Sequence, residues 1–389
     1  MVEKNQSFVQ SIETQISHTM KIRTITCHDV CNYGASLQAL ALQTYLEREG
    51  HDVRIIDYLP EYSIPYKLWD VSPASHLYKP SKYFFLIKLF WAVRRYFQVR
   101  PTFARKEAFK RFNDRFLHLT EHYSSYNELA TNPPEADMYI AGSDQIWRTN
   151  LGNGKDPAFY LQFGNRDTKR VSYAASFGLP YLTEGMEYLI KTYLSQFDAI
   201  SVREKSGVEI LKSLELEGNL VTDPVFLLSK DLWNEILEIK KRKIDVPYLL
   251  VYDLNGRCMH NEKLSFVKEY AKIHKLKVVA INDIRSTKYA QLNVNDASPE
   301  DFVNLIQYAD IVVSDSFHAT AFSCIMNTPF RVFFDRPQAA RIKDFLDMVE
   351  LSDCINNNDL QTNIDWNKTN AILSQFVFKS KQYLHHVME

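Results

Sequence analysis

The stretch KIRTITCHDVCNYGASLQALALQTYLEREGHDVRIIDY, residues 21–58, places one helix pattern between two strand patterns. Residues 21–27 and 51–58 carry the short apolar runs of strands, whereas residues 32–50 repeat apolar side chains at helical spacing and close at a glycine. This order predicts a unit of a parallel sheet, because parallel neighbours need a crossover connection. The stretch therefore predicts an α/β fold.

The same alternation continues along the chain in two series. Strand patterns at 137–147 and 170–178 end in small residues and complete the first series. After a charged helical connection, strand patterns recur at 248–254, 275–283 and 310–316, with helix patterns between them. Two Rossmann-like domains, with a cleft between the carboxyl ends of their strands, explain both series.

The predicted domain boundaries follow from these series. We expect a loose N-terminal extension over residues 1–20 and a first domain over 21–228, which includes a basic, aromatic insertion at 66–112. A connection over 229–246 then leads to a second domain over 247–389, which ends in a helical segment. A length of 389 residues fits two domains, since one domain usually takes about 100 to 200 residues.

Composition excludes several classes of protein. The chain is 46% hydrophobic and 24% charged, as in an ordinary globular protein. A formal net charge of -1 argues against a nucleic-acid partner bound by a wholly basic surface. The polar residues 1–20 lack the apolar core of a signal peptide, and no later stretch is apolar enough to span a membrane. Five scattered cysteines form no disulfide framework or zinc signature, so we expect a cytoplasmic protein without a metal.

The loop before the first helix pattern is a candidate ligand site. Asn32, Tyr33 and Gly34 lie between a strand and a helix, where unpaired backbone N–H groups can face an anion. The alternative is a tight turn that needs Gly34 for conformational reasons alone. We expect these three residues to line the cleft or the acceptor site.

A second candidate is AGSDQIW, residues 141–147, where a strand pattern ends and a helix is expected to begin. Ser143 and Asp144 are suited to capping such a helix. Gln145 and Trp147 are less easily explained as caps, and a tryptophan beside polar groups can stack on a sugar. We therefore expect Ser143, Asp144, Gln145 and Trp147 to line the cleft.

Two further side chains stand at predicted strand ends. Arg203, in SVREKSG, forms a surface ion pair or directs its planar group into the cleft, where it suits a carboxylate or phosphate. His318 follows the strand pattern IVVSDS and stands where a helix begins. On spacing alone it is a core residue, a cap or a catalytic residue.

Taken together, five segments resemble the polysaccharide pyruvyl transferase family. They are NYGASLQALAL, AGSDQIW, SVREKSG, VTDPVFLL and SDSFHATAFSCIMNTPF, and the similarity runs in order through roughly residues 21–350. The resemblance implies two Rossmann-like domains arranged as in GT-B glycosyltransferases. It also implies transfer of a pyruvyl group from phosphoenolpyruvate to two hydroxyls of a hexose, which forms a cyclic ketal and releases phosphate. In the family, the arginine matched by Arg203 binds phosphoenolpyruvate, and the histidine matched by His318 is the proposed general acid.

The sequence departs from the family pattern at one position. Some members have an arginine two residues before the histidine, where this chain has Ser316 followed by Phe317. Phosphoenolpyruvate carries a carboxylate and a phosphate, so a second cation is expected in the donor site. Arg341 is the first candidate and Arg285 is the second, and both could instead be ordinary solvated arginines.

The reaction also needs a base for the sugar hydroxyls, and it needs no cofactor. Asp315, Asp144 and Asp29 are the available carboxylates, with Asp315 taken as the first candidate. Phosphoenolpyruvate is the donor substrate, and a histidine can supply the proton near neutral pH.

The insertion suggests a partner of a different kind. Residues 66–112 carry eleven Lys or Arg residues against two acidic residues, around the apolar centre YFFLIKLFWAV. Such a segment suits a helix lying on an anionic membrane surface through residues near Lys82 to Arg111. The alternative is a helix packed on its own domain. A hexose acceptor on a polyprenyl carrier, in a surface or capsular polysaccharide precursor, would bring the enzyme to the inner face of the membrane.

Two other classes of function stay open at this point. One is a GT-B glycosyltransferase that uses a nucleotide sugar, although no clear acidic residue for the ribose is evident. The other is a non-catalytic glycan-binding protein on the same fold, which Ser316 in place of an arginine would fit. Binding of a sugar nucleotide but not of phosphoenolpyruvate would favour the first, and binding of acceptor without release of phosphate would support the second.

Overall fold

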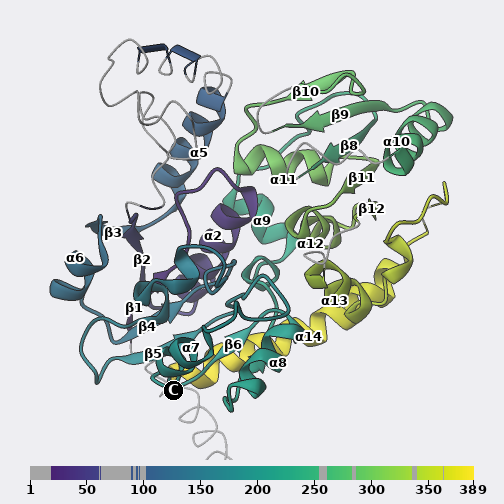
Figure 1. Ribbon diagram of the computed structural model, residues 1–389. Helices are drawn as coiled ribbons and strands as arrows, with labels where there is room; N and C mark the ends of the chain where they lie inside the picture. The colour runs from purple at the N-terminus through teal and green to yellow at the C-terminus, as the bar shows by residue number, and fades with distance from the viewer. Residues whose placement is uncertain are drawn as a thin grey trace, which may run out of the picture.

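The computed structural model describes residues 19–60, 62, 89–90, 93–94, 96, 102–253, 261–282, 286–334, 340–361 and 363–389. Nearly all of the expected N-terminal extension and most of the insertion at 66–112 lie outside the described residues. Two sheets and the helices around them make up the two halves of the molecule (Figure 1).

The sheet of the N-terminal half consists of five parallel strands in the order β3-β2-β1-β4-β5. Their bounds are β1 Lys21–Ile25, β2 Asp52–Tyr58, β3 Leu119–Tyr123, β4 Met138–Ala141 and β5 Lys169–Ser172. A short parallel pair, β6 Ser201–Val202 and β7 Asn219–Leu220, continues beside β5 through isolated bridges.

The sheet of the C-terminal half repeats this topology. Its order is β10-β9-β8-β11-β12, and all of its pairs are parallel. The bounds are β8 Tyr248–Tyr252, β9 Lys277–Ile281, β10 Leu292–Val294, β11 Ile311–Ser314 and β12 Phe330–Val332. In each sheet the first strand lies in the middle, the next two on one side and the last two on the other, which is the Rossmann order. The expected fold class, α/β with two Rossmann-like domains in a GT-B-like arrangement, is confirmed.

Three inner strands are buried along their whole length. Every residue of β4, β8 and β11 is buried, which explains why their sequences run apolar without alternation. Helices on both faces of each sheet provide this cover. Their bounds are α2 Tyr33–Arg48, α5 Phe103–Phe116, α6 Tyr126–Thr131, α7 Glu187–Leu194, α8 Lys205–Ser213, α9 Lys230–Ile236, α10 Asn261–Ile273, α11 Pro299–Gln307, α12 Phe317–Met326, α13 Ala340–Met348 and α14 Trp366–Met388.

Local sequence sets the ends of several helices. Ser298 and Asp301 form a capping box at the start of α11, with Pro299 in the first turn. Helix α12 ends at Asn327, whose φ of 57° is the left-handed conformation common after a helix. The expected connection over residues 229–246 contains α9, which follows the 3-10 turn η5 Pro224–Leu227.

Helix α14 returns from the C-terminal half to the N-terminal half, where it runs beside β5 and α7 (Figure 1). The Tyr383 hydroxyl donates to the Ser172 carbonyl oxygen in β5 at 2.9 Å. The Ser380 hydroxyl accepts from the Thr222 N–H at 2.8 Å. The helical segment at the end of the chain therefore completes the first domain.

No helix in the described part of the chain combines the length and the apolar character needed to cross a membrane.

Candidate active site

The site forms between the two sheets, at the ends of their middle strands. In each sheet the strand order reverses between the first strand and the fourth, which are β1 and β4 in one and β8 and β11 in the other. Ligands of such sheets bind outside the carboxyl ends of the strands at this reversal. The loops after β1, β4 and β11 carry most of the side chains predicted from the sequence.

His318 is held at the start of α12, the helix that follows β11. Ser316 caps this helix by accepting from the Ala319 N–H at 3.4 Å. The His318 residue is 8% exposed, and its Nε2 lies 3.5 Å from Asp223 Oδ2 without a hydrogen bond. The cap of this helix is therefore Ser316 and not His318, whose ring is buried beside a carboxylate.

Gly34 lies against the other side of the His318 ring. A Cβ atom added at Gly34 would lie 1.9 Å from His318 Nδ1. Because α2 belongs to the first domain and α12 to the second, this contact joins the domains at the site. The absence of a side chain at Gly34 makes room for the histidine.

Arg203 follows β6 and is almost fully buried, with a side chain 2% exposed. Its Nη1 donates to Asp223 Oδ2 at 2.5 Å, and its Nη2 donates to Asp144 Oδ1 at 3.3 Å. The Phe317 ring lies beneath the guanidinium at 5.3 Å. Burial would lower the pKa of Arg203, but Asp223, Asp144 and Glu204 raise it above its ordinary value. The predicted donor-binding arginine is thus a fixed cation.

Sequence reasoning assigned no role to Asp223, which is central to the site. Its side chain is fully buried, and its Oδ2 faces both Arg203 and His318. Burial alone would raise the pKa of this carboxyl, but His318 and Arg203 hold it well below its usual range. The only sequence signal was the Asp-Pro step in VTDPVFLL, which indicates a turn as readily as a site.

Arg341, in the first turn of α13, lies close enough to interact electrostatically with Arg203, Glu204 and Asp144. Burial, followed by repulsion from Arg203, lowers its pKa to about 10. Its Nε is buried without a hydrogen-bond partner, and among the described residues it forms no ion pair. Arg341 is therefore a second cation beside Arg203. The other candidate, Arg285, lies outside the described residues.

The segment after β4 differs from the predicted helix. Residues 143–150 form turns, and Asp144 has a φ of 72°, which a helix start does not allow. The Ser143 hydroxyl donates to Asp223 Oδ2 at 3.4 Å instead of capping a helix. Ser143 and Asp144 therefore belong, with Asp223, to a polar cluster around Arg203.

Two of the predicted cleft residues prove to be buried. Trp147 is 0% exposed, stacks on Tyr160 at 5.7 Å and donates its indole N–H to the Phe159 carbonyl oxygen. Tyr33 stacks on Phe302 of the second domain at 4.4 Å and is 1% exposed. Packing, which sequence spacing does not report, places both rings in the core, so neither presents a face to a sugar here.

Gln145 and Asn32 lie on a pocket of ≈ 470 Å³ beside the polar cluster. Asn32 also caps α2, where its Oδ1 accepts from the Gly34 N–H at 3.0 Å. Gln145 Oε1 accepts from Arg148 Nη1 at 2.8 Å. Polar groups thus line one part of this pocket, together with Asp29 and Asp144.

Aromatic rings also line this pocket. Tyr58, Tyr62 and Phe159 all contribute, and both tyrosine hydroxyls donate to Asp156 Oδ2 at 2.6 Å. A pocket lined by both aromatic rings and polar groups has a composition suited to a sugar.

The remaining predicted residues lie around the buried cations. Asp315 directly follows β11 and is partly buried. Phe317 and Arg203 line a small cavity of ≈ 20 Å³, together with Asp223 and Phe345. This space is about that of one water molecule, so it does not admit a larger ligand in this structure.

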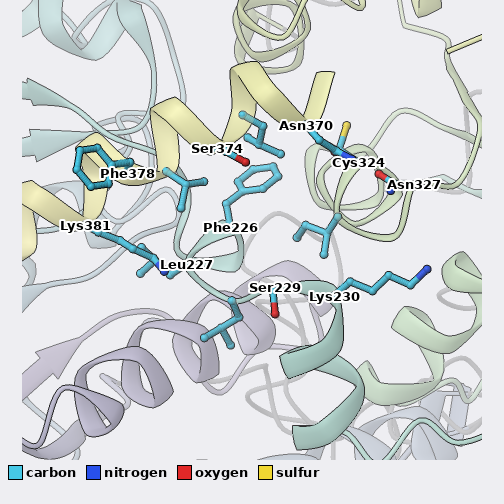
Figure 2. A pocket seen from close by; sticks show the side chains of 14 residues that line it. Phe226, Leu227, Ser229, Lys230, Cys324, Asn327, Asn370, Ser374, Phe378 and Lys381 are labelled. Atoms are coloured by element: carbon cyan, nitrogen blue, oxygen red, sulfur yellow. The ribbon is translucent and has the colours of Figure 1, made fainter. Parts of the chain in front are cut away.

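Figure 2 shows a larger pocket, of ≈ 520 Å³, between η5, α12 and α14. Phe226, Lys230 and Phe378 are among the side chains around it, and no site residue predicted from the sequence lines it. Among the residues that the structure describes, no group of three or more His, Cys, Asp or Glu side chains could hold a metal ion.

Comparison with known proteins gave one family match and several likenesses of fold. The family model described as polysaccharide pyruvyl transferase matches residues 32–333, which is most of the chain. No curated protein matched the chain.

Three solved structures illustrate the likeness of fold. The UDP-GlcNAc 2-epimerase from Methanocaldococcus jannaschii has 13% identity and a TM-score of 0.47, with 92% of each chain covered. The UDP-N-acetylglucosamine 2-epimerase from Rickettsia bellii has 10% identity and a TM-score of 0.45, with 95% of this chain and 98% of that chain covered. The glycosyltransferase SnogD from Streptomyces nogalater has 11% identity and a TM-score of 0.42, with 95% and 100% covered.

Proposed function

The chain belongs to the polysaccharide pyruvyl transferase family, and from this premise we propose that it forms a pyruvyl ketal on a hexose. The donor is phosphoenolpyruvate and the acceptor offers two hydroxyls of one sugar in a surface or capsular polysaccharide precursor. The products are the cyclic ketal and inorganic phosphate. No cofactor takes part.

The chemistry assigns a role to each charged side chain. His318 gives a proton to C3 of phosphoenolpyruvate, which makes C2 electrophilic, and the first sugar hydroxyl adds to C2 and releases its proton. The second hydroxyl then replaces the phosphate at C2, and its proton balances the departing phosphate. One of the carboxylates Asp315, Asp144 and Asp29 accepts a hydroxyl proton, with Asp315 as the first candidate.

The proposal that phosphoenolpyruvate is the donor is supported chiefly by the closeness of Arg203 and Arg341. Two guanidinium groups are close enough to lower the pKa of one of them, and Arg341 has a buried Nε with no partner. A phosphate and a carboxylate together supply the negative charge that such a pair lacks. Arg203 is oriented by its hydrogen bonds to Asp223 and Asp144. Arg341 has a buried Nε without such a partner, so it is the more available cation for the donor.

The acceptor binds in the pocket of ≈ 470 Å³ between Tyr62 and Gln145. The rings of this pocket favour the apolar face of a sugar, its carboxylates can accept hydrogen bonds from the sugar hydroxyls, and its amides can accept or donate. Asp144 lies both on this pocket and on Arg203, so it marks the point where donor and acceptor meet.

The acceptor is proposed to be carried on a polyprenyl lipid, and the enzyme to bind the inner face of an anionic membrane. Among the described residues of the insertion, Leu89, Phe90, Val93 and Tyr96 are exposed, with Phe90 at 57%. Their spacing places them near one face of a helix, and the sequence around them is rich in Lys and Arg.

The direct test is incubation with phosphoenolpyruvate and a panel of lipid-linked galactosyl and mannosyl acceptors. We expect a mass gain equal to one pyruvyl ketal, with release of one phosphate per ketal formed. Binding of acceptor without phosphate release would instead support a glycan-binding protein. Turnover of a nucleotide sugar, with none of phosphoenolpyruvate, would support a glycosyltransferase.

A further inference from the structure

The carboxylate of Asp223 is held in place by its own segment of the chain. It lies at the start of η5, where its Oδ1 accepts from the Val225 N–H at 3.1 Å. Pro224 follows directly and fixes the backbone dihedral φ at this point. The carboxylate is therefore held by the turn that bears it, and its second oxygen faces the site in a set direction.

Three side chains converge on that second oxygen, Oδ2. Arg203 Nη1 lies at 2.5 Å, the Ser143 hydroxyl at 3.4 Å and His318 Nε2 at 3.5 Å. The first two belong to the N-terminal domain, whereas His318 belongs to the C-terminal domain. One oxygen atom thus faces both residues assigned to the donor chemistry, and it does so across the domain boundary.

The environment of His318 leaves it few other orientations. Nε2 is buried and has no hydrogen bond, because 3.5 Å exceeds the usual range for a hydrogen bond to a carboxylate. A ring displacement of about half an ångström toward Oδ2 would make that bond. On the side of Nδ1, the backbone of Gly34 limits movement in the opposite direction.

We propose that Asp223 is a positioning residue for the transfer reaction, and that it orients His318 and Arg203 through the single atom Oδ2. This inference rests on the proposed function for its kinetic consequence, but the orientation of the ring can be tested without catalysis. The Asp223 side chain is fully buried and its Oδ2 faces Arg203 and His318, so we assign it no contact with the reacting atoms.

Asp223→Asn is the informative variant, with Asp144→Asn as its matched control. The amide keeps the size of the side chain and an oxygen that can cap η5, but it loses the charge at Oδ2. Asp144 also pairs with Arg203, at 3.3 Å, but it has no ion pair or hydrogen bond with His318 among the described residues. Only the first variant is expected to alter the histidine.

The measurement is the pair of imidazole nitrogen signals of His318 in protein labelled with ¹⁵N-histidine, identified by their loss in His318→Gln. We expect these signals to shift in Asp223→Asn and to stay in place in Asp144→Asn. Unchanged signals in a folded Asp223→Asn variant would overturn the proposal, whether or not the protein transfers pyruvate.

Turnover supplies the second readout, through a double-mutant cycle. If Asp223 acts through His318, Asp223→Asn should lower kcat by about 10-fold or more in the wild type but by much less in a His318→Gln background. Equal losses in both backgrounds would mean that Asp223 acts independently of the histidine, which contradicts the proposal. A complete lack of turnover in the wild type would refute the proposed function and leave the spectroscopic result to decide the orientation.

Discussion

His318 lies at the meeting point of two helices that belong to different domains. At 8% exposure it could serve the core alone, and replacing it would then cost stability and not activity. As a proton donor it would show the opposite pattern. We predict that His318→Gln keeps its fold and much of its affinity for phosphoenolpyruvate, because the amide preserves size and some hydrogen bonding, but loses turnover by about 100-fold or more.

Turnover, donor affinity and melting temperature should be measured on the same preparation of this variant. A folded His318→Gln protein with near-normal turnover would remove the histidine from the proton-transfer step. Arg203→Ala is the useful comparison, since it should lose donor binding as well.

Gly34 is predicted to be intolerant of a single methyl group. In Gly34→Ala the new Cβ would meet His318 Nδ1 at 1.9 Å, so the ring must leave its place. Alanine favours a helix by about 0.5 to 1 kcal/mol over glycine, so the cost should appear in kcat far more than in the melting temperature. Gly207→Ala in α8 is the control, because its Cβ would come no closer than 3.1 Å, to Val202. Equal kcat values for the two variants would show that Gly34 has no such role.

Arg341 is predicted to bind the donor selectively. Arg341→Ala should raise the KM for phosphoenolpyruvate by about 10- to 100-fold, because a charge-assisted hydrogen bond contributes about 1.5 to 3 kcal/mol. The KM for the acceptor should change little. Arg148→Ala should give the reverse pattern, since Arg148 lines the acceptor pocket. If Arg341→Ala raised both constants equally, the second cation would have to be sought at Arg285.

At the scale of single elements, the insertion is predicted to attach the enzyme to membranes. Replacing Lys82, Lys88, Arg94 and Arg95 with Gln should weaken sedimentation with anionic liposomes by about 1 kcal/mol per charge removed. Turnover of a soluble acceptor should be unaffected. The matched control replaces the same number of exposed lysines elsewhere, at Lys212, Lys240, Lys241 and Lys275. If both sets of substitutions weakened liposome binding equally, the binding would depend on the overall charge of the protein and not on the insertion.

The elements themselves were largely predictable from the sequence, because buried parallel strands and amphipathic helices leave regular patterns. The site was predictable only where a side chain follows a strand end, as with Arg203 and His318. Asp223 was missed because its role depends on an arginine 20 residues away and a histidine in the other domain, and no local pattern encodes either contact. Trp147 was wrongly expected to line the cleft, because spacing does not reveal that its ring is fully buried and stacked on Tyr160.

At the scale of the whole molecule, Asp223 is predicted to make stability depend on pH. At about pH 7, Asp223→Asn should lower the free energy of unfolding by about 3 kcal/mol, because it removes one partner of a buried charge pair. The pKa of Asp223 is lower in the folded protein than in the unfolded chain, so its carboxylate stabilises the fold at any pH above the pKa of the unfolded chain. This stabilisation is lost as the pH falls toward the pKa of the folded protein. The difference between wild type and variant should therefore narrow below about pH 4.

Urea unfolding at several pH values measures this difference. Asp114→Asn is the control, since its pair with Lys110 is exposed and should contribute well under 1 kcal/mol. A difference for Asp223→Asn that stayed constant into the acid range would contradict the assignment of a charged Asp223.

The return of α14 to the first domain has a consequence for how the protein is made. Tyr383 bonds to Ser172 in β5, so a strand near the middle of the chain lacks this partner until residue 383 has been synthesised. At about 5 to 20 residues per second, a ribosome needs roughly 10 to 40 seconds for the intervening residues. During that interval the nascent first domain exposes the surface that α14 later covers. The two halves of this molecule therefore do not mature in the order in which they are translated.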